Sequence, residues 1–162
     1  MSSSHTADAK IEFLDDPDTV RRKIEEANCQ PKDISSNNGV LGLLLDVILP
    51  ISQMRVERLA GNIGYNSTEP ANLLKPQSPF TSPCAPRGSI LTIHNAQNGH
   101  PTHYYTYKQV ERHYAVGIIT PADLKCVVIK ALNELLQPIR DTYANSLEWQ
   151  SVEQEAYPGD RF

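Results

Sequence analysis

Apolar residues near the start of the chain recur at helical spacing. Val20, Ile24 and Ala27 fall on one face of a helix, because residues three and four positions apart share a face. Asp16 and Pro17 precede this stripe and form a typical helix start, since Asp caps the first turn and Pro suits the first helical position. The pattern therefore predicts a first helix that begins at these two residues.

Residues 38–49 are apolar almost all round, which predicts a second helix at the centre of the core. We expect Pro50 to end this helix, because a proline disfavours helical backbone in the residue before it. Apolar and charged residues then alternate over 54–59, which indicates a short strand. A second strand is predicted over 89–94, and we expect these two strands to pair as a hairpin.

The segment between the two predicted strands, residues 60–88, holds much of the chain's Pro, Gly, Ser and Asn and shows no periodicity. Such a composition is typical of a loop, since Gly and Pro interrupt both helices and strands. We therefore interpret 60–88 as a long flexible insertion within the domain.

The last part of the chain carries further helix signals. Thr106 is placed to cap a short helix that runs to about Ala115 and ends at Gly117. Thr120 and Pro121 open the longest predicted helix, again a cap followed by proline. Its apolar residues recur at positions i, i+3, i+4 and i+7, which predicts one buried stripe. They are Leu124, Val127, Val128, Ala131, Leu132, Leu135, Leu136 and Ile139.

Pro138 lies inside this last pattern and is expected to kink or end the helix, because it removes a backbone hydrogen bond. A final short helix is predicted over 146–156, with Trp149 as its packing anchor. The sum of these elements predicts a mainly α fold: a helical bundle with a small β-hairpin and a long irregular insertion.

Composition limits the classes of function. A chain of 162 residues fits one domain, and a net charge of −4 argues against free-standing nucleic-acid binding unless Lys and Arg gather on one face. The apolar run 40–51 is shorter than the ~18 residues of a membrane span and contains Asp46, so no membrane contact is expected. Cys29, Cys84 and Cys126 are odd in number and widely spaced, as in reduced cytosolic proteins.

Histidines and tyrosines are the other candidates for chemistry. His100, His103 and His113 lack the Cys or carboxylate partners of a metal site, so no metal is predicted. The three tyrosines at 104, 105 and 107 are interpreted as one core ring and two surface rings. No Gly-rich strand–loop–helix unit occurs, which indicates that the chain holds no nucleotide-binding fold of its own.

Five segments in order carry a resemblance to a known family. The most specific is Pro121–Arg140, with the sequence PADLKCVVIKALNELLQPIR. The others are Met1–Ser4 followed by Lys10–Asp15, Asn38–Leu41 at a helix start, Tyr104–Ala115, and Ala156–Pro158. Together they resemble the C-terminal half of eukaryotic and archaeal-type tyrosyl-tRNA synthetases. The resemblance covers nearly the whole chain except residues 60 to about 88.

The resemblance implies a fragment of a class I aminoacyl-tRNA synthetase, a ligase of translation. The family's Rossmann domain uses ATP, with Mg²⁺, to attach tyrosine to its tRNA. Met1, Ser2, Ser3 and Ser4 resemble the tail of its Lys-Met-Ser-Ser-Ser loop, although a frayed polar terminus explains them as well. We expect residues 1–15 to be a remnant of that loop and its linker, and 16–157 to be the helical anticodon-binding domain. The chain alone is expected to hold no cofactor and to be inactive.

The resemblance also assigns two positions to the anticodon. Asp123 matches the family residue whose carboxylate accepts hydrogen bonds from the anticodon guanine; a first-turn Asp favoured by the helix dipole is an equal alternative. The family's stacking aromatic falls on Asn98, which has no aromatic face to offer. Tyr104 or Tyr105 would then be the substitutes.

Four basic residues are candidates for phosphate contacts: Lys108, Arg112, Lys125 and Lys130. Each would add affinity without base specificity, and an ordinary solvated helix face is the alternative for each.

The expected partner is a tyrosine-specific tRNA in the cytoplasm, with no DNA and no membrane. The family dimerises through its catalytic domain, so this chain is expected to be a monomer. The second hypothesis is a non-catalytic helical module that binds protein, with 60–88 as its contact loop.

Overall fold

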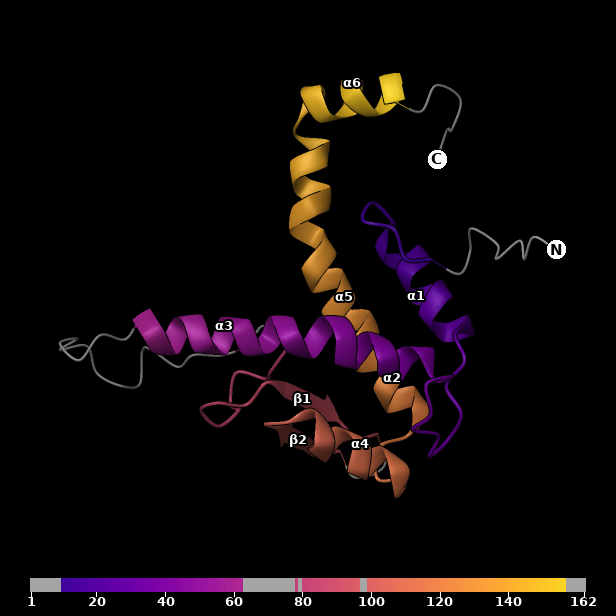
Figure 1. The fold of residues 1–162 in the computed structure, drawn as a ribbon, viewed down its shortest axis with the longest axis vertical. Helices are drawn as coiled ribbons and strands as arrows, with labels where there is room; N and C mark the ends of the chain where they lie inside the picture. Colours follow the sequence, from indigo (N-terminus) through magenta and orange to yellow (C-terminus); the bar gives the residue numbers. More distant parts are fainter. Residues whose placement is uncertain (1–9, 63–77, 79, 97–98, 157–162) are drawn as a thin grey trace.

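The computed structural model describes residues 10–62, 78, 80–96 and 99–156 of the chain. In these residues the fold is mainly helical with one two-stranded hairpin, as the sequence predicts (Figure 1). The elements in chain order are α1 (Pro17–Glu26), α2 (Gly39–Leu43), the π-helical turn η2 (Leu44–Ile48), α3 (Leu49–Asn62), β1 (Leu91–His94), β2 (Pro101–Tyr104), α4 (Tyr107–Ala115), α5 (Pro121–Ala144) and α6 (Leu147–Ala156).

Helix α5 is the element around which the others are arranged. It contacts α1, α2, η2 and β1 along its length and α6 at its far end. Figure 1 shows α1 beside α5, the α2–α3 helix crossing it, and the hairpin with α4 on the other side of that crossing. The predicted stripe of α5 is confirmed, because Leu124, Val128 and Ala131 are buried against these neighbours.

Helix α1 begins where the sequence predicts. Asp16 is its N-cap, and Asp16 Oδ1 accepts hydrogen bonds from the backbone N–H groups of Asp18 and Thr19 at 2.9 Å each. Val20 and Ile24 are buried, so the predicted stripe faces the core. The cap and the stripe together fix where the helix starts and which face it buries.

The second helix is longer than predicted, because Pro50 does not end it. α2, η2 and α3 follow one another without interruption from Gly39 to Asn62. At the end of η2 the Leu49 N–H donates to Leu44 O, five residues back, and Pro50 comes next. The proline thus falls where the hydrogen-bond ladder already changes its spacing, which is where a helix tolerates a missing donor.

The predicted strand over 54–59 is therefore wrong, since these residues lie in α3. Ile48 and Ser52 are buried and Val56 is half-buried, and this spacing of four residues is that of a helix face. Ser52 carries the inward contact: its Oγ is hydrogen-bonded to Ser78 Oγ and to Ile90 O, just before β1. A small polar residue at the centre of the face hides the helical period from a count of apolar positions.

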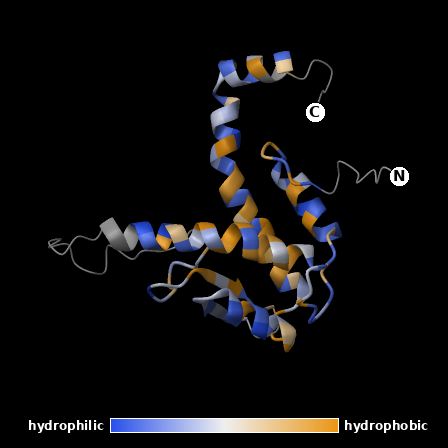
Figure 2. Cartoon of the chain, viewed as in Figure 1, coloured by the Kyte–Doolittle hydropathy of each residue, from blue (hydrophilic) through white to orange (hydrophobic). Residues whose placement is uncertain are grey.

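The stretch Gly39–Arg58 is also long and apolar enough, by length and composition alone, to cross a membrane. The sequence prediction considered only the apolar run 40–51, which is too short for a span, whereas the described helix continues beyond it. The observation is weak, because the core helix of a soluble protein passes the same test. Figure 2 shows the apolar part of this helix where it crosses α5, as expected of a core contact.

The hairpin is formed by β1 and β2, which pair antiparallel with Leu91 opposite Tyr104 and His94 opposite Pro101. The strand predicted over 89–94 is confirmed over Leu91–His94, but its partner is β2 rather than 54–59. The other edge of β1 bonds a loop instead: the Thr92 N–H donates to Phe80 O at 3.0 Å.

The predicted insertion 60–88 is described only in part. Residues 60–62 belong to α3, 63–77 and 79 lie outside the described residues, and 80–88 form turns against β1. Phe80 and Ala85 are buried in this last part. Flexibility of the insertion stays a prediction.

Helix α4 is confirmed, with Val110 and Tyr114 fully buried and Gly117 at a φ of +83° after its end. Helix α5 starts at the predicted Thr120–Pro121 and continues through Pro138 to Ala144, so of the two predicted effects of Pro138, a kink or an end, the end is wrong. Pro138 is exposed, and a helix can leave the carbonyl that a proline orphans to water on its exposed side.

Helix α6 is confirmed over Leu147–Ala156, but Trp149 is not the packing anchor that the sequence predicts. Trp149 is 51% exposed and Leu147 82% exposed. Figure 1 shows why: α6 turns away at the far end of α5 and contacts little else.

Candidate functional site

Asp123 lies at the third position of α5 and is buried, with 4% exposure. Its Oδ2 accepts hydrogen bonds from the backbone N–H of Thr120 at 3.0 Å and from the Thr120 hydroxyl at 2.7 Å. The Thr120 hydroxyl accepts in turn from the Asp123 N–H at 3.1 Å, which completes a capping box. Oδ1 accepts from the Ala96 N–H at 3.0 Å. The carboxylate thus caps α5 and holds the loop after β1.

Hydrogen bonds stabilise the negative charge of the Asp123 carboxylate. Burial by itself raises the pKa of Asp123, but the hydrogen bonds from the Thr120 hydroxyl and from the Ala96 and Thr120 N–H groups outweigh burial. The pKa therefore lies below its ordinary value. Asp123 is ionised at neutral pH and can accept a further donor as a full carboxylate.

A cavity of about 250 Å³ opens beside this carboxylate. Its walls come from three parts of the chain that lie far apart in the sequence. They include Phe80 and Ser82 of the loop before β1, Thr92 and His94 of β1, and Asp123, Lys130 and Glu134 of α5. Ligand pockets for drug-sized molecules are usually larger, at about 300–1,000 Å³, so this cavity suits a group the size of a nucleobase.

Two aromatic side chains line the cavity, and the sequence singled out neither. Phe80 is buried, and the Arg55 guanidinium lies 6.0 Å from its ring centroid. His94 is exposed at the end of β1. The signal for His94 is the strand alternation of 91–94, which places it on the same face as Thr92; Phe80 sits in an irregular loop that carries no period.

Hydrogen bonds fix the wall of the cavity at β1. Thr92 Oγ1 accepts from the Ser82 N–H at 3.0 Å and is hydrogen-bonded to His103 Nδ1 at 2.9 Å. Asn95, the next residue after β1, is buried and donates from Nδ2 to Ile118 O. The strand end is thus tied to the loop before it and to the turn before α5.

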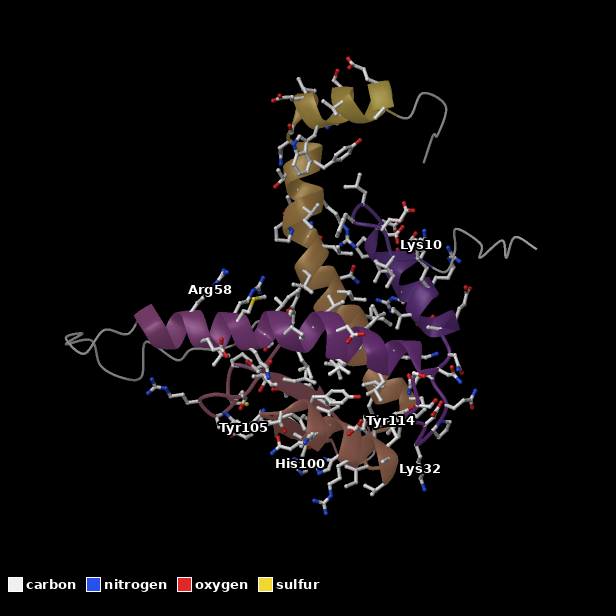
Figure 3. All side chains as sticks on the ribbon, viewed as in Figure 1. Lys10, Lys32, Arg58, His100, Tyr105 and Tyr114 are labelled. Atoms are coloured by element: carbon white, nitrogen blue, oxygen red, sulfur yellow. The ribbon has the colours of Figure 1, made fainter. Side chains whose placement is uncertain are left out.

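The proposed aromatic substitutes differ from each other. Tyr104 is buried, so its ring cannot stack on a base. Its hydroxyl is hydrogen-bonded to His113 Nδ1 at 3.1 Å, and burial raises the pKa of this hydroxyl to about 12. Tyr105 is 41% exposed at the end of the hairpin (Figure 3). Tyr114 lies inward under the α2 end in the same view and is fully buried. Neither Tyr104 nor Tyr105 lines the cavity.

The four predicted phosphate contacts divide into two pairs. Lys125 and Lys130 lie on α5 close to Asp123, and Lys130 lines the cavity. Lys108 and Arg112 are exposed on α4 and do not line it. Met1, Ser2, Ser3, Ser4 and Asn98 lie outside the described residues. In the part of the chain that the structure describes, no group of three His, Cys, Asp or Glu side chains is placed to hold a metal ion.

Comparison with known sequences gives one consistent result. The chain is 31% identical over 159 residues to the cytoplasmic tyrosine–tRNA ligase of Xenopus tropicalis, a match that covers 98% of this chain and 23% of that protein. It is 28% identical to the cytoplasmic enzyme of Saccharomyces cerevisiae and 26% identical to the tyrosine–tRNA ligase of Haloarcula marismortui. These matches cover 96% and 98% of this chain, and 32% and 35% of those proteins.

Over nearly its whole length the chain is similar to one part of the tyrosyl-tRNA synthetases. It spans about a quarter to a third of the length of the synthetases that it matches. The match includes Asp123 and the helix α5 that carries it, the segment on which the sequence resemblance is most specific. No model of a protein family matches the sequence.

Solved synthetase structures show the same fold. The tyrosyl-tRNA synthetase of Pyrococcus horikoshii superposes with a TM-score of 0.63 at 21% identity, over 94% of this chain and 32% of that one. The Aeropyrum pernix synthetase gives a TM-score of 0.62 at 22% identity, over 99% of this chain and 35% of that one. The mainly α domain with its small hairpin is therefore a fold found within these synthetases.

Proposed function

We propose that this chain holds the anticodon loop of a tyrosine-specific tRNA, with the anticodon guanine in the cavity beside Asp123. The observation that carries the proposal is an ionised carboxylate in the wall of a nucleobase-sized cavity. The similarity to synthetases supports it, since the relatives are tyrosine–tRNA ligases and the matched part contains this helix.

The hydrogen bonds of Asp123 limit how a guanine binds. A carboxylate offers about four acceptor positions, and here Oδ2 already accepts two hydrogen bonds and Oδ1 one. One position on Oδ1 remains while the cap of α5 is kept. Guanine therefore gives Oδ1 a single hydrogen bond, from N1–H or from the 2-amino group, rather than the bidentate pair that an uncommitted carboxylate accepts.

Stacking comes from the cavity wall in place of Asn98. Phe80 and His94 both line the cavity, and exposed His94 offers the ring on which the base stacks. Base–aromatic stacking contributes about 1–3 kcal/mol per base, which is comparable to the single hydrogen bond to Asp123. Stacking supplies affinity and the hydrogen bond supplies the preference for guanine, without a strongly basic domain.

The reaction that the family's enzymes catalyse takes place outside this site. We propose that the chain serves ATP- and Mg²⁺-dependent attachment of tyrosine to tRNA as its RNA-holding part, in the cytoplasm, and that the chain by itself forms no tyrosyl-adenylate. Met1, Ser2, Ser3 and Ser4 would correspond to the tail of the family's ATP loop, and dimerisation would belong to the catalytic domain of the family.

The test changes the RNA and leaves the protein intact. A labelled tyrosine-tRNA anticodon stem–loop is titrated with the chain by fluorescence anisotropy, with guanine, inosine or adenine at the recognised position. We expect guanine to bind several-fold more tightly than adenine, which lacks the N1–H donor. Equal binding of all three RNAs, or no binding at low salt, contradicts the proposal. Adenylate formation from tyrosine and ATP by the chain would contradict the inactive assignment.

One observation favours the alternative of a protein-interaction module. α6 presents Leu147, Trp149 and Val152 to solvent, with exposures of 82%, 51% and 59%. Exposed aromatic and aliphatic side chains on one short helix are typical of a protein contact. Absence of RNA binding at every salt concentration would favour this alternative.

A further inference from the structure

A second hollow lies on α5 next to the base cavity, between α5 and α1. It has a volume of about 520 Å³ and is lined by Arg21 and Glu25 of α1 and by Lys125, Lys130 and Asn133 of α5, among others. The two helices pack antiparallel, since Lys125 Nζ donates to Glu25 O at 2.7 Å near one end and Arg140 Nε donates to Asp15 O at 2.7 Å near the other. We call this hollow the α1–α5 groove.

The α1–α5 groove is basic on a chain whose net charge is −4. Three cations line it, Arg21, Lys125 and Lys130, against the one carboxylate of Glu25. Within the described residues, no hydrogen bond or ion pair involves the side chains of Arg21 or Lys130, which are both exposed. Lys125 is held by the carbonyl of Glu25, and an ammonium group has two further N–H donors. Among the described residues that line the groove, positive charges therefore outnumber negative ones by two, three cations against one carboxylate.

The groove and the base cavity share a wall. Cys126 and Lys130, one turn apart on α5, line both hollows. A nucleotide whose base enters the cavity beside Asp123 must leave its phosphate outside, and the rim nearest to the groove carries the Lys130 ammonium. The next phosphates then follow α1 past Lys125 and Arg21.

We propose that the α1–α5 groove holds the sugar–phosphate backbone of the RNA strand next to the base bound in the cavity. Arg21 is the new contact, a residue to which the sequence analysis assigned no role. Its guanidinium is suited to bidentate hydrogen bonding of a phosphate, while Lys125 and Lys130 act as point charges. The proposal deepens the proposed function and rests on it.

The experiment measures binding of the guanine-containing anticodon stem–loop to the intact chain over a series of salt concentrations. R21A and K130A are compared with R58A, which removes an exposed arginine on α3 away from both hollows (Figure 3). We expect R21A and K130A each to weaken binding several-fold and to lower the salt slope by about one, while the guanine preference stays. R58A should bind as the native chain does.

Arg21 and Lys130 are exposed, so both variants should fold, and the far-UV circular dichroism of each variant checks this. Charge reversal in R21E should weaken binding further than R21A. Native affinity and native salt slope in R21A, K130A and R21E, together with intact guanine preference, would overturn the groove proposal and leave the proposed function standing. If the native chain itself shows no preference for guanine, the result would instead contradict the proposed function.

Discussion

The carboxylate of Asp123 accepts a hydrogen bond at 3.0 Å from the backbone N–H of Ala96, a residue 27 positions earlier in the chain. This contact joins the first turn of α5 to the loop that follows β1. The same carboxylate closes the capping box of α5 with Thr120. One side chain therefore sets both the start of the central helix and the edge of the base cavity.

Replacing Asp123 by Asn should destabilise the fold by about 1–3 kcal/mol, because the amide nitrogen must face a backbone or hydroxyl donor that the carboxylate now accepts. Urea unfolding measures the change. The matched control is Glu57→Gln on the exposed side of α3, which should stay within about 0.5 kcal/mol of the native chain. An unchanged midpoint in Asp123→Asn would show that these hydrogen bonds are not formed.

The lowered pKa of Asp123 also predicts how its contribution to the free energy of unfolding changes in acid. A carboxyl whose folded pKa is depressed contributes stability above its unfolded pKa, about 3.9, and loses that contribution as pH falls through the lower folded pKa. Unfolding measured over a pH series should therefore show a shallower acid dependence in Asp123→Asn than in the native chain.

Arg140 should anchor the segment before α1. Its Nε donates to Asp15 O at 2.7 Å and its Nη2 to Asn133 Oδ1 at 3.0 Å, while Lys23 Nζ lies 2.8 Å from Asp15 Oδ2 in a largely buried ion pair. Arg140→Ala should cost about 1.5–3 kcal/mol, as is usual for hydrogen bonds from a charged group. It should also speed amide hydrogen exchange over residues 11–16.

The comparison for Arg140→Ala is Arg58→Ala, which removes an equal charge from an exposed position. If both variants show the same exchange rates over 11–16, then Arg140 does not hold this segment.

Gly117 should not tolerate a side chain. Its φ of +83° is disfavoured for L-residues, and a Cβ there would lie 2.8 Å from Lys32 Cε. Gly117→Ala should lower stability by about 1–2 kcal/mol from the backbone conformation alone. Thermal unfolding of Gly117→Ala and of Gly117→Ala with Lys32→Ala separates the two causes: the double variant should keep the backbone cost and lose the clash. Full recovery in the double variant would assign the whole cost to Lys32.

Stability should fall in alkali as the buried tyrosines ionise. Burial, with the charge of Asp123 in addition, raises the pKa of Tyr104 from 10.0 to about 12. A folded pKa raised above the unfolded value means that the contribution is complete below pH 10 and is lost as pH rises toward 12. Unfolding free energies across this range should fall less steeply in Tyr104→Phe than in the native chain. Exposed Tyr105→Phe should follow the native curve.

The sequence predicts the elements that local rules determine. Asp16–Pro17 and Thr120–Pro121 locate two helix starts, because capping and the fixed φ of proline act within one turn. Pro50 and Pro138 mislead for the same reason, since a local rule gives no account of a π-helical turn or of an exposed helix face.

The site is harder to predict because its parts meet only through tertiary contacts. The family resemblance predicts Asp123 as a site residue. Its hydrogen bond from the Ala96 N–H, however, depends on where the irregular loop after β1 lies. Phe80 is held at the cavity wall by a backbone hydrogen bond, in which the Thr92 N–H of β1 donates to the Phe80 carbonyl. Arg21 belongs to the solvated face of an amphipathic helix by its sequence pattern, and only the packing of α1 on α5 brings it beside Lys130.

The π-helical turn at Leu44–Ile48 means that the long helix carries one residue more than an α-helix of the same path needs. Deleting one residue there would leave a regular α-helix on the same path, and Ser52 would keep facing Ser78 and Ile90. Deleting one residue between this turn and Ser52 would instead rotate Ser52 by about 100° away from them, since each residue advances an α-helix by that angle. Homologues that lack the extra residue would therefore align with this chain on both sides of the turn, with a one-residue gap at the turn itself.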